Sequence, residues 1–76
     1  MKVNLAGNEI KITKDSGEQF NCLISNIALV EYLLNNEVRI HFKFGPNNFI
    51  KCKTTNLYVN DILVTKSVFE ATISVY

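Results

Sequence analysis

Few side chains in this sequence could perform acid–base, nucleophilic or metal chemistry: the histidine His41 and the cysteines Cys22 and Cys52. Catalysis by such groups needs a nucleophile and an orienting acid within reach. His41 falls on a predicted exposed strand face, where pairing with Glu31 is the simplest interpretation. Each cysteine has apolar neighbours at strand spacing, which is typical of buried free thiols. The sequence therefore predicts no catalytic residue.

Metal and nucleotide sites each need a recognisable residue spacing. The two cysteines and the histidine form neither C-x-x-C nor H-x-x-x-H, the spacings that structural zinc sites use. Gly7, Gly17 and Gly45 form no G-x-G-x-x-G or G-x-x-x-x-G-K pattern of a phosphate-binding loop. We therefore expect no enzymatic activity, no metal and no cofactor.

One segment has an unusual charge distribution, because residues 38–60 hold four Lys or Arg and no Asp or Glu. In the hairpin predicted to turn at 46–48, Lys43 faces Lys51 and His41 faces Lys53. Like charges directly opposite destabilise a sheet by roughly 0.2 to 1 kcal/mol per pair. An acidic protein or a phosphate backbone would relieve that repulsion. The predicted binding residues for an anionic partner are Arg39, His41, Lys43, Lys51 and Lys53.

Short strands must position these residues, since turn-forming residues recur about every ten positions, as in a meandering all-β domain. Alternation of apolar and polar residues predicts strands at 38–44 and 69–76. Further strands are predicted at 2–6, 9–13, 18–25, 50–54, 57–59 and 62–65. The predicted fold class is all-β, a small antiparallel meander that closes as a barrel or sandwich.

The segment 26–36 fits two interpretations. Good helix formers follow a capping Ser25 or Asn26, so a short helix at about 26–35, and with it an α+β fold, is the alternative. Apolar residues would surround such a helix, and a small chain has little material to bury it on all sides. We therefore favour a strand, with a loop at 35–37 that keeps the Glu31 carboxylate out of the core. In that register Ile27, Leu29 and Leu33 face outward and are predicted to form an interface.

The length of 76 residues allows one domain, 1–76, and 47% hydrophobic residues with a formal charge of +1 indicate a globular protein. So small a core cannot cover both apolar faces of residues 27–34, which predicts a two-fold homodimer. No apolar run reaches the roughly 20 residues that span a bilayer, and the first residues lack a secretory signal. We expect a cytoplasmic protein without a membrane partner.

These observations favour a non-enzymatic protein-binding module that occupies the acidic surface of another protein, as a small inhibitor or adaptor does. Frequent Asn, Lys and Ile fit an AT-rich genome, and mobile elements or phages are one source of such inhibitors. The first alternative is a small nucleic-acid-binding β-barrel that uses the basic strand face. The second is a self-assembling structural subunit.

Overall fold

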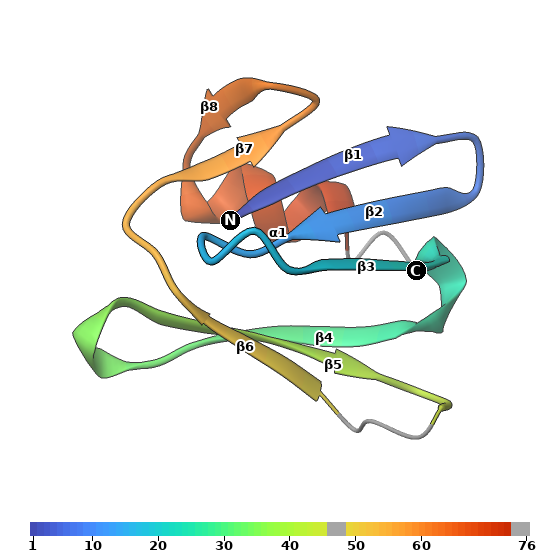
Figure 1. The fold of residues 1–76 in the computed structure, drawn as a ribbon, viewed down its shortest axis with the longest axis horizontal. Coiled ribbons are helices and arrows are strands. Elements are labelled where there is room, and N and C mark those ends of the chain that lie inside the picture. Colours follow the sequence, from blue (N-terminus) through green and yellow to red (C-terminus); the bar gives the residue numbers. More distant parts are fainter. Residues whose placement is uncertain (46–48, 74–76) are drawn as a thin grey trace.

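The computed structural model describes residues 1–45 and 49–73, in which eight strands form two sheets and a helix follows them (Figure 1). One sheet has the order β3-β2-β1-β7-β8, and the other has the order β4-β5-β6. The elements are β1 Lys2–Ala6, β2 Glu9–Thr13, β3 Gln19–Leu23, β4 Ile27–Tyr32, β5 Glu37–Phe42, β6 Phe49–Lys53, β7 Leu57–Val59, β8 Ile62–Val64 and α1 Lys66–Ile73. Single 3-10 turns lie at Ile24–Asn26 and Leu34–Asn36.

The predicted all-β fold is confirmed in part: the described residues are mostly strand, but a helix follows the strands, and the two sheets do not close into a barrel. β1 and β7 pair in parallel, whereas the other strand pairs are antiparallel. After β6 the chain crosses from the three-stranded sheet to the far side of β1, so a simple antiparallel meander is wrong. Each sheet keeps its own edge strands, because no pairing joins one sheet to the other within the described residues.

The strand interpretation of 26–36 is confirmed, and the helix at about 26–35 is wrong. β4 occupies most of this segment, and Asn35 and Asn36 then turn the chain with φ values of 64° and 61°, which asparagine tolerates well. The predicted register was in error by two residues, since Tyr32 lies opposite Val38 and not Ile40. An even shift preserves which side chains face inward, so Glu31 still points outward.

A β-bulge between Ile27 and Leu29 corrects the predicted interface group. Such a bulge adds one residue to a strand and reverses its alternation locally. Ile27 is consequently buried in the core, whereas Leu29 remains exposed. The prediction that Ile27 faces outward is therefore wrong.

The β5–β6 hairpin also has a different register from the predicted one. His41 lies opposite Phe49, four residues from Lys53, and Arg39 lies opposite Lys51. The predicted pairs Lys43 with Lys51 and His41 with Lys53 are therefore wrong. β5 ends at Phe42, so the connection from β5 to β6 is longer than expected. The predicted turn at 46–48 lies outside the described residues.

The C-terminal segment is a helix and not the predicted strand at 69–76, of which 74–76 lie outside the described residues. Phe69 and Ile73 are four residues apart, so one helix face buries both of them completely. The Thr65 hydroxyl accepts a hydrogen bond of 3.2 Å from the Val68 N–H, which caps the first turn. Spacing by four satisfies the helical period and the strand period alike, which explains the wrong prediction.

One apolar cluster holds both sheets and α1 together. Figure 1 shows the five-stranded sheet and α1 on the same side of the three-stranded sheet. Val3 and Ile12 contribute from the larger sheet, Ile40 from the smaller one and Phe69 from α1. Because the inward residues of β4, β5 and β6 are occupied by this core, the opposite face of their sheet is available for other contacts.

Candidate functional site

Alternate residues of β4, β5 and β6 point away from the core and form one continuous face. We call it the outer face; it consists of Leu29, Glu31, Glu37, Arg39, His41, Phe49, Lys51 and Lys53. The strand pairing arranges it in rows, since His41 lies between Leu29 and Phe49, and Arg39 lies between Glu31 and Lys51. A third row pairs Glu37 with Lys53. One end of the face is thus apolar and the other is charged.

The apolar end is built around Phe49. Its side chain is 39% exposed, and that of Leu29, at the other end of the row, is 49% exposed. The Arg39 guanidinium lies 5.2 Å from the centre of the Phe49 ring, and the His41 ring centre lies 5.3 Å from it. A cation–π contact at an exposed site contributes about 0.5–1 kcal/mol. These contacts orient Phe49 while leaving much of its ring accessible.

Two carboxylates, Glu31 and Glu37, lie among the cations of the charged end, and only the contact of Glu37 was not predicted from the sequence. Arg39 donates a 2.6 Å hydrogen bond to Glu37, and this bond holds the pKa of Glu37 below its ordinary value. The predicted pairing of His41 with Glu31 is confirmed, with 3.0 Å between Nε2 and Oε1. Both acids precede the acid-free stretch in sequence, and strand pairing brings them beside it.

Lys51 and Lys53 keep their charges available. Within residues 1–45 and 49–73, neither ammonium lies within ion-pair distance of a carboxylate. Both side chains are exposed and line a hollow of about 360 Å³, which Lys14, Asp15 and Glu37 also line. The Lys14 ammonium is 3.3 Å from Glu18. The cationic character of this end therefore comes mainly from Lys51 and Lys53.

The structure brings together four of the five predicted anion-binding residues: Arg39, His41, Lys51 and Lys53. Lys43 is exposed beyond the end of β5 and has no place in the paired rows. Of the predicted interface group, Leu29 lies on the outer face, Leu33 is half-buried after the end of β4, and Ile27 belongs to the core. The strand predicted at 50–54 omitted Phe49, which is the first residue of β6.

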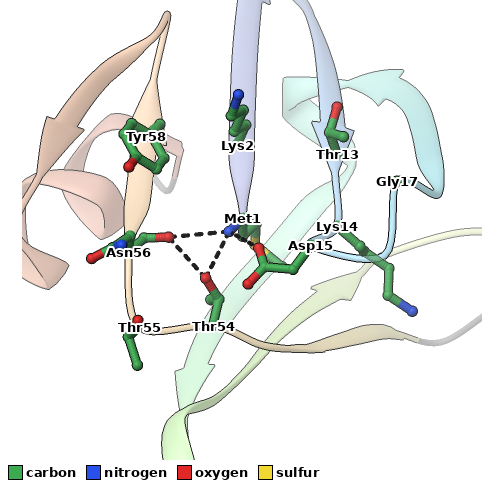
Figure 2. Close-up of a pocket in the computed structure, with 10 residues that line it drawn as sticks. All are labelled: Met1, Lys2, Thr13, Lys14, Asp15, Gly17, Thr54, Thr55, Asn56 and Tyr58. Atoms are coloured by element: carbon green, nitrogen blue, oxygen red, sulfur yellow. Dashed lines mark hydrogen bonds and ion pairs between the residues drawn. The ribbon is translucent and has the colours of Figure 1, made fainter.

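A second hollow, of about 400 Å³, surrounds the first residue (Figure 2). With Met1 as the first residue, its nitrogen is an ammonium group that lies 2.5 Å from Asp15 Oδ1 and 2.8 Å from Thr54 Oγ1. It also donates a 3.1 Å hydrogen bond to the Asn56 carbonyl. These contacts join the β2–β3 turn to the segment that connects the two sheets.

The groups around the Met1 nitrogen already satisfy one another. The Thr54 hydroxyl donates to the Asn56 carbonyl at 2.8 Å, and the Asp15 carboxylate is occupied by the ammonium. Partial burial raises the pKa of Asp15, but contacts with the ammonium and with Thr54 outweigh burial, so the net pKa lies below its ordinary value. This arrangement is what a structural contact between sheets requires, because these four residues satisfy one another.

The two cysteines test directly which residues of β3 and β6 face the core. Cys52 is buried in the core, and Cys22 on β3 is half-buried, where burial raises the pKa of its thiol. Because the thiolate is the reactive form, we expect a thiol reagent to label Cys22 at least about tenfold more slowly than the unfolded chain. Cys52 should be labelled only after denaturation, and mass spectrometry of peptides distinguishes the two. Rapid labelling of Cys52 in the native protein would contradict the inward orientation of β6.

Other kinds of site can be judged within the described residues. No three His, Cys, Asp or Glu side chains there are grouped so that they could hold a metal ion. No helix in residues 1–45 and 49–73 has the length and apolar character needed to cross a membrane. Comparisons with protein-family models, curated proteins and solved structures give no match to this chain. Any functional conclusion must therefore come from the residues of the outer face themselves.

Proposed function

We propose that this protein is a non-enzymatic binding module that occupies the acidic surface of another protein through its outer face. The observation that carries the proposal is the exposure of Leu29 and Phe49 on the same face as Lys51 and Lys53, two cations that form no ion pair within the described part of the chain. Protein interfaces commonly combine an apolar aromatic anchor with a polar rim. We expect an acidic occupant because Arg39, Lys51 and Lys53 outnumber Glu31 and Glu37 on this face.

Each half of the outer face contributes differently to such an interface. Phe49 is the expected anchor, since it is aromatic and already oriented by Arg39 and His41. Lys51 and Lys53 can meet carboxylates of a partner without first breaking an ion pair of their own. Rim charges of this kind mainly accelerate association and determine its dependence on salt. We therefore assign affinity chiefly to Phe49 and recognition of acidic partners to the two lysines.

Affinity capture with matched variants tests the proposal. The immobilised wild-type protein should retain a discrete protein from a lysate of its host, and the retained protein is identified by mass spectrometry. Phe49→Ala should reduce capture about tenfold or more, because loss of an aromatic anchor costs about 2 kcal/mol or more. The double variant Lys51→Glu with Lys53→Glu should reduce capture most strongly at low salt.

The control is Lys11→Glu, which makes one such charge reversal at an exposed position of β2 in the other sheet. It should capture the protein as well as the wild type does. Equal capture by the wild type and the outer-face variants would refute the proposal, and so would equal loss in the control. Loss of the captured protein after nuclease treatment would favour the nucleic-acid alternative instead.

A nucleic acid is the second candidate partner, favoured by the contact between Arg39 and Phe49. A base could stack on the Phe49 ring while Lys51 and Lys53 contact phosphates. Single-strand binding proteins stack successive bases on several aromatic side chains, whereas the outer face has one, which is why the protein partner ranks first. Binding of a labelled dT12 oligonucleotide that weakens steeply with salt would reverse this order.

A further inference from the structure

β8 is an edge strand of the five-stranded sheet, on the side away from β1 (Figure 1). Ile62 and Leu63 are 66% and 60% exposed, which is high for aliphatic residues in a strand. Edge strands are usually protected by lysine, proline or a bulge, and the sequence Ile-Leu-Val of β8 contains none of these. This edge is thus apolar along its length and carries none of these protective features.

Backbone hydrogen bonds establish which residue of β8 faces this open edge. The N–H of Tyr58 donates to the Met1 carbonyl at 3.1 Å, so Tyr58 directs its backbone groups toward β1 and away from β8. Leu63 is its antiparallel partner. In an antiparallel pair, both residues point their N–H and C=O groups either toward each other or away from each other. Leu63 therefore presents its N–H and C=O to the open edge.

We propose that β8 is a self-pairing edge through which two copies of this chain associate, with Leu63 opposite Leu63 of the second copy. In this two-fold arrangement the Leu63 N–H of each copy donates to the Leu63 carbonyl of the other. The two Leu63 side chains contact each other on one face, and Ile62 packs against Val64 of the second copy on the other face. The contact would partly bury four exposed aliphatic side chains, Ile62 and Leu63 from each copy.

Charge complementarity favours a second copy over another occupant. An acidic residue, Asp61, precedes β8, and a basic residue, Lys66, follows it after Thr65. Antiparallel pairing about Leu63 brings Asp61 of each copy opposite Thr65 and next to Lys66 of the other. The same attraction occurs twice because the pairing is symmetric. A strand of three residues buries much less than the roughly 1,200 Å² of a standard interface, so the dimer is expected to be weak.

This inference does not depend on the outer face, which lies on the other sheet and stays accessible in the proposed dimer. Sedimentation velocity and NMR diffusion, from about 10 μM to about 1 mM, should show the wild type passing from monomer to dimer. Leu63→Lys and Leu63→Glu each place like charges face to face at the two-fold axis, so each should weaken association about tenfold or more. An equimolar mixture of the two variants should associate again, because opposite charges then face each other.

The control pair is Leu34→Lys and Leu34→Glu, which change an exposed leucine in the turn between β4 and β5. These variants should associate as the wild type does, and their mixture should behave no differently. Circular dichroism and thermal unfolding should show that all four variants fold, since both leucines are exposed. A wild type that stays monomeric at about 1 mM would overturn the proposal. Association that is insensitive to the Leu63 variants, or a mixture that stays monomeric, would also overturn it.

Discussion

Phe69→Ala is expected to lower the free energy of unfolding by about 3–5 kcal/mol, the usual cost of deleting a buried phenylalanine side chain. Phe69 is completely buried and joins α1 to the core formed by both sheets. A domain of this length typically has only about 4–11 kcal/mol of stability, so the variant should be close to unfolding. Urea denaturation followed by circular dichroism measures the change.

Ala71 provides the matched control, because it distinguishes the helix from the strand that alternation predicts. In α1 its side chain is exposed, whereas in a strand it would face inward with Phe69. Ala71→Glu should therefore cost less than about 1 kcal/mol. A loss as large as that of Phe69→Ala would mean that the C-terminal segment is a strand.

Asp15→Asn is expected to lower the free energy of unfolding by about 1–2 kcal/mol at pH 7, because it removes the charged partner of the buried Met1 ammonium. Hydrogen bonds to charged groups contribute about 1.5–3 kcal/mol, and we reduce this value because the Asp15 side chain is half exposed. Acetylation of the Met1 nitrogen removes the same interaction from the other side. Acetylation also disturbs the hydrogen bonds of this nitrogen to Thr54 and Asn56, so urea denaturation should show a loss at least as large as that of Asp15→Asn.

The Met1 contact also predicts how stability depends on pH. The pKa of Asp15 is lowered in the folded protein, so its contribution is fully present above the ordinary aspartate pKa of about 3.9. That contribution is lost as pH falls from there through the folded-state pKa. The wild type should therefore lose more stability than Asp15→Asn below about pH 4. The control Glu9→Gln changes an exposed carboxylate of β2 that forms no ion pair within the described residues, so it should keep the wild-type pH dependence. Equal slopes for all three proteins would contradict the prediction.

The sequence pattern predicted the strands β1 to β8 and most of their inward-facing side chains, but it placed Ile27 on the wrong face and predicted a strand where α1 lies. Val30, Val38 and Ile40 are buried as expected, although the register between β4 and β5 differs from the predicted one. Register depends on loop length and on the bulge at Ile27, and neither leaves a clear signal in local sequence. The helix was missed because Phe69 and Ile73 satisfy two periods at once.

The outer face was predictable in part for the same reason. Alternation placed Glu31, Arg39, His41, Lys51 and Lys53 on one face, whereas Glu37, which was assigned to a loop, joins that face through strand pairing. The Met1 contact could not be predicted, since its partners Asp15 and Thr54 lie 14 and 53 residues away in sequence. Contacts between segments so far apart in sequence can be recognised only from the three-dimensional fold.

The most direct test of the proposed function is NMR mapping of the ¹⁵N-labelled protein during titration with the purified protein identified by affinity capture. The largest amide shift changes should fall on β4, β5 and β6, around Leu29, Arg39, Phe49 and Lys51. They should be lost in Phe49→Ala and retained in Lys11→Glu. Shift changes confined to the five-stranded sheet, or changes on the outer face that dT12 produces and the purified protein does not, would contradict the proposal that this face binds a protein.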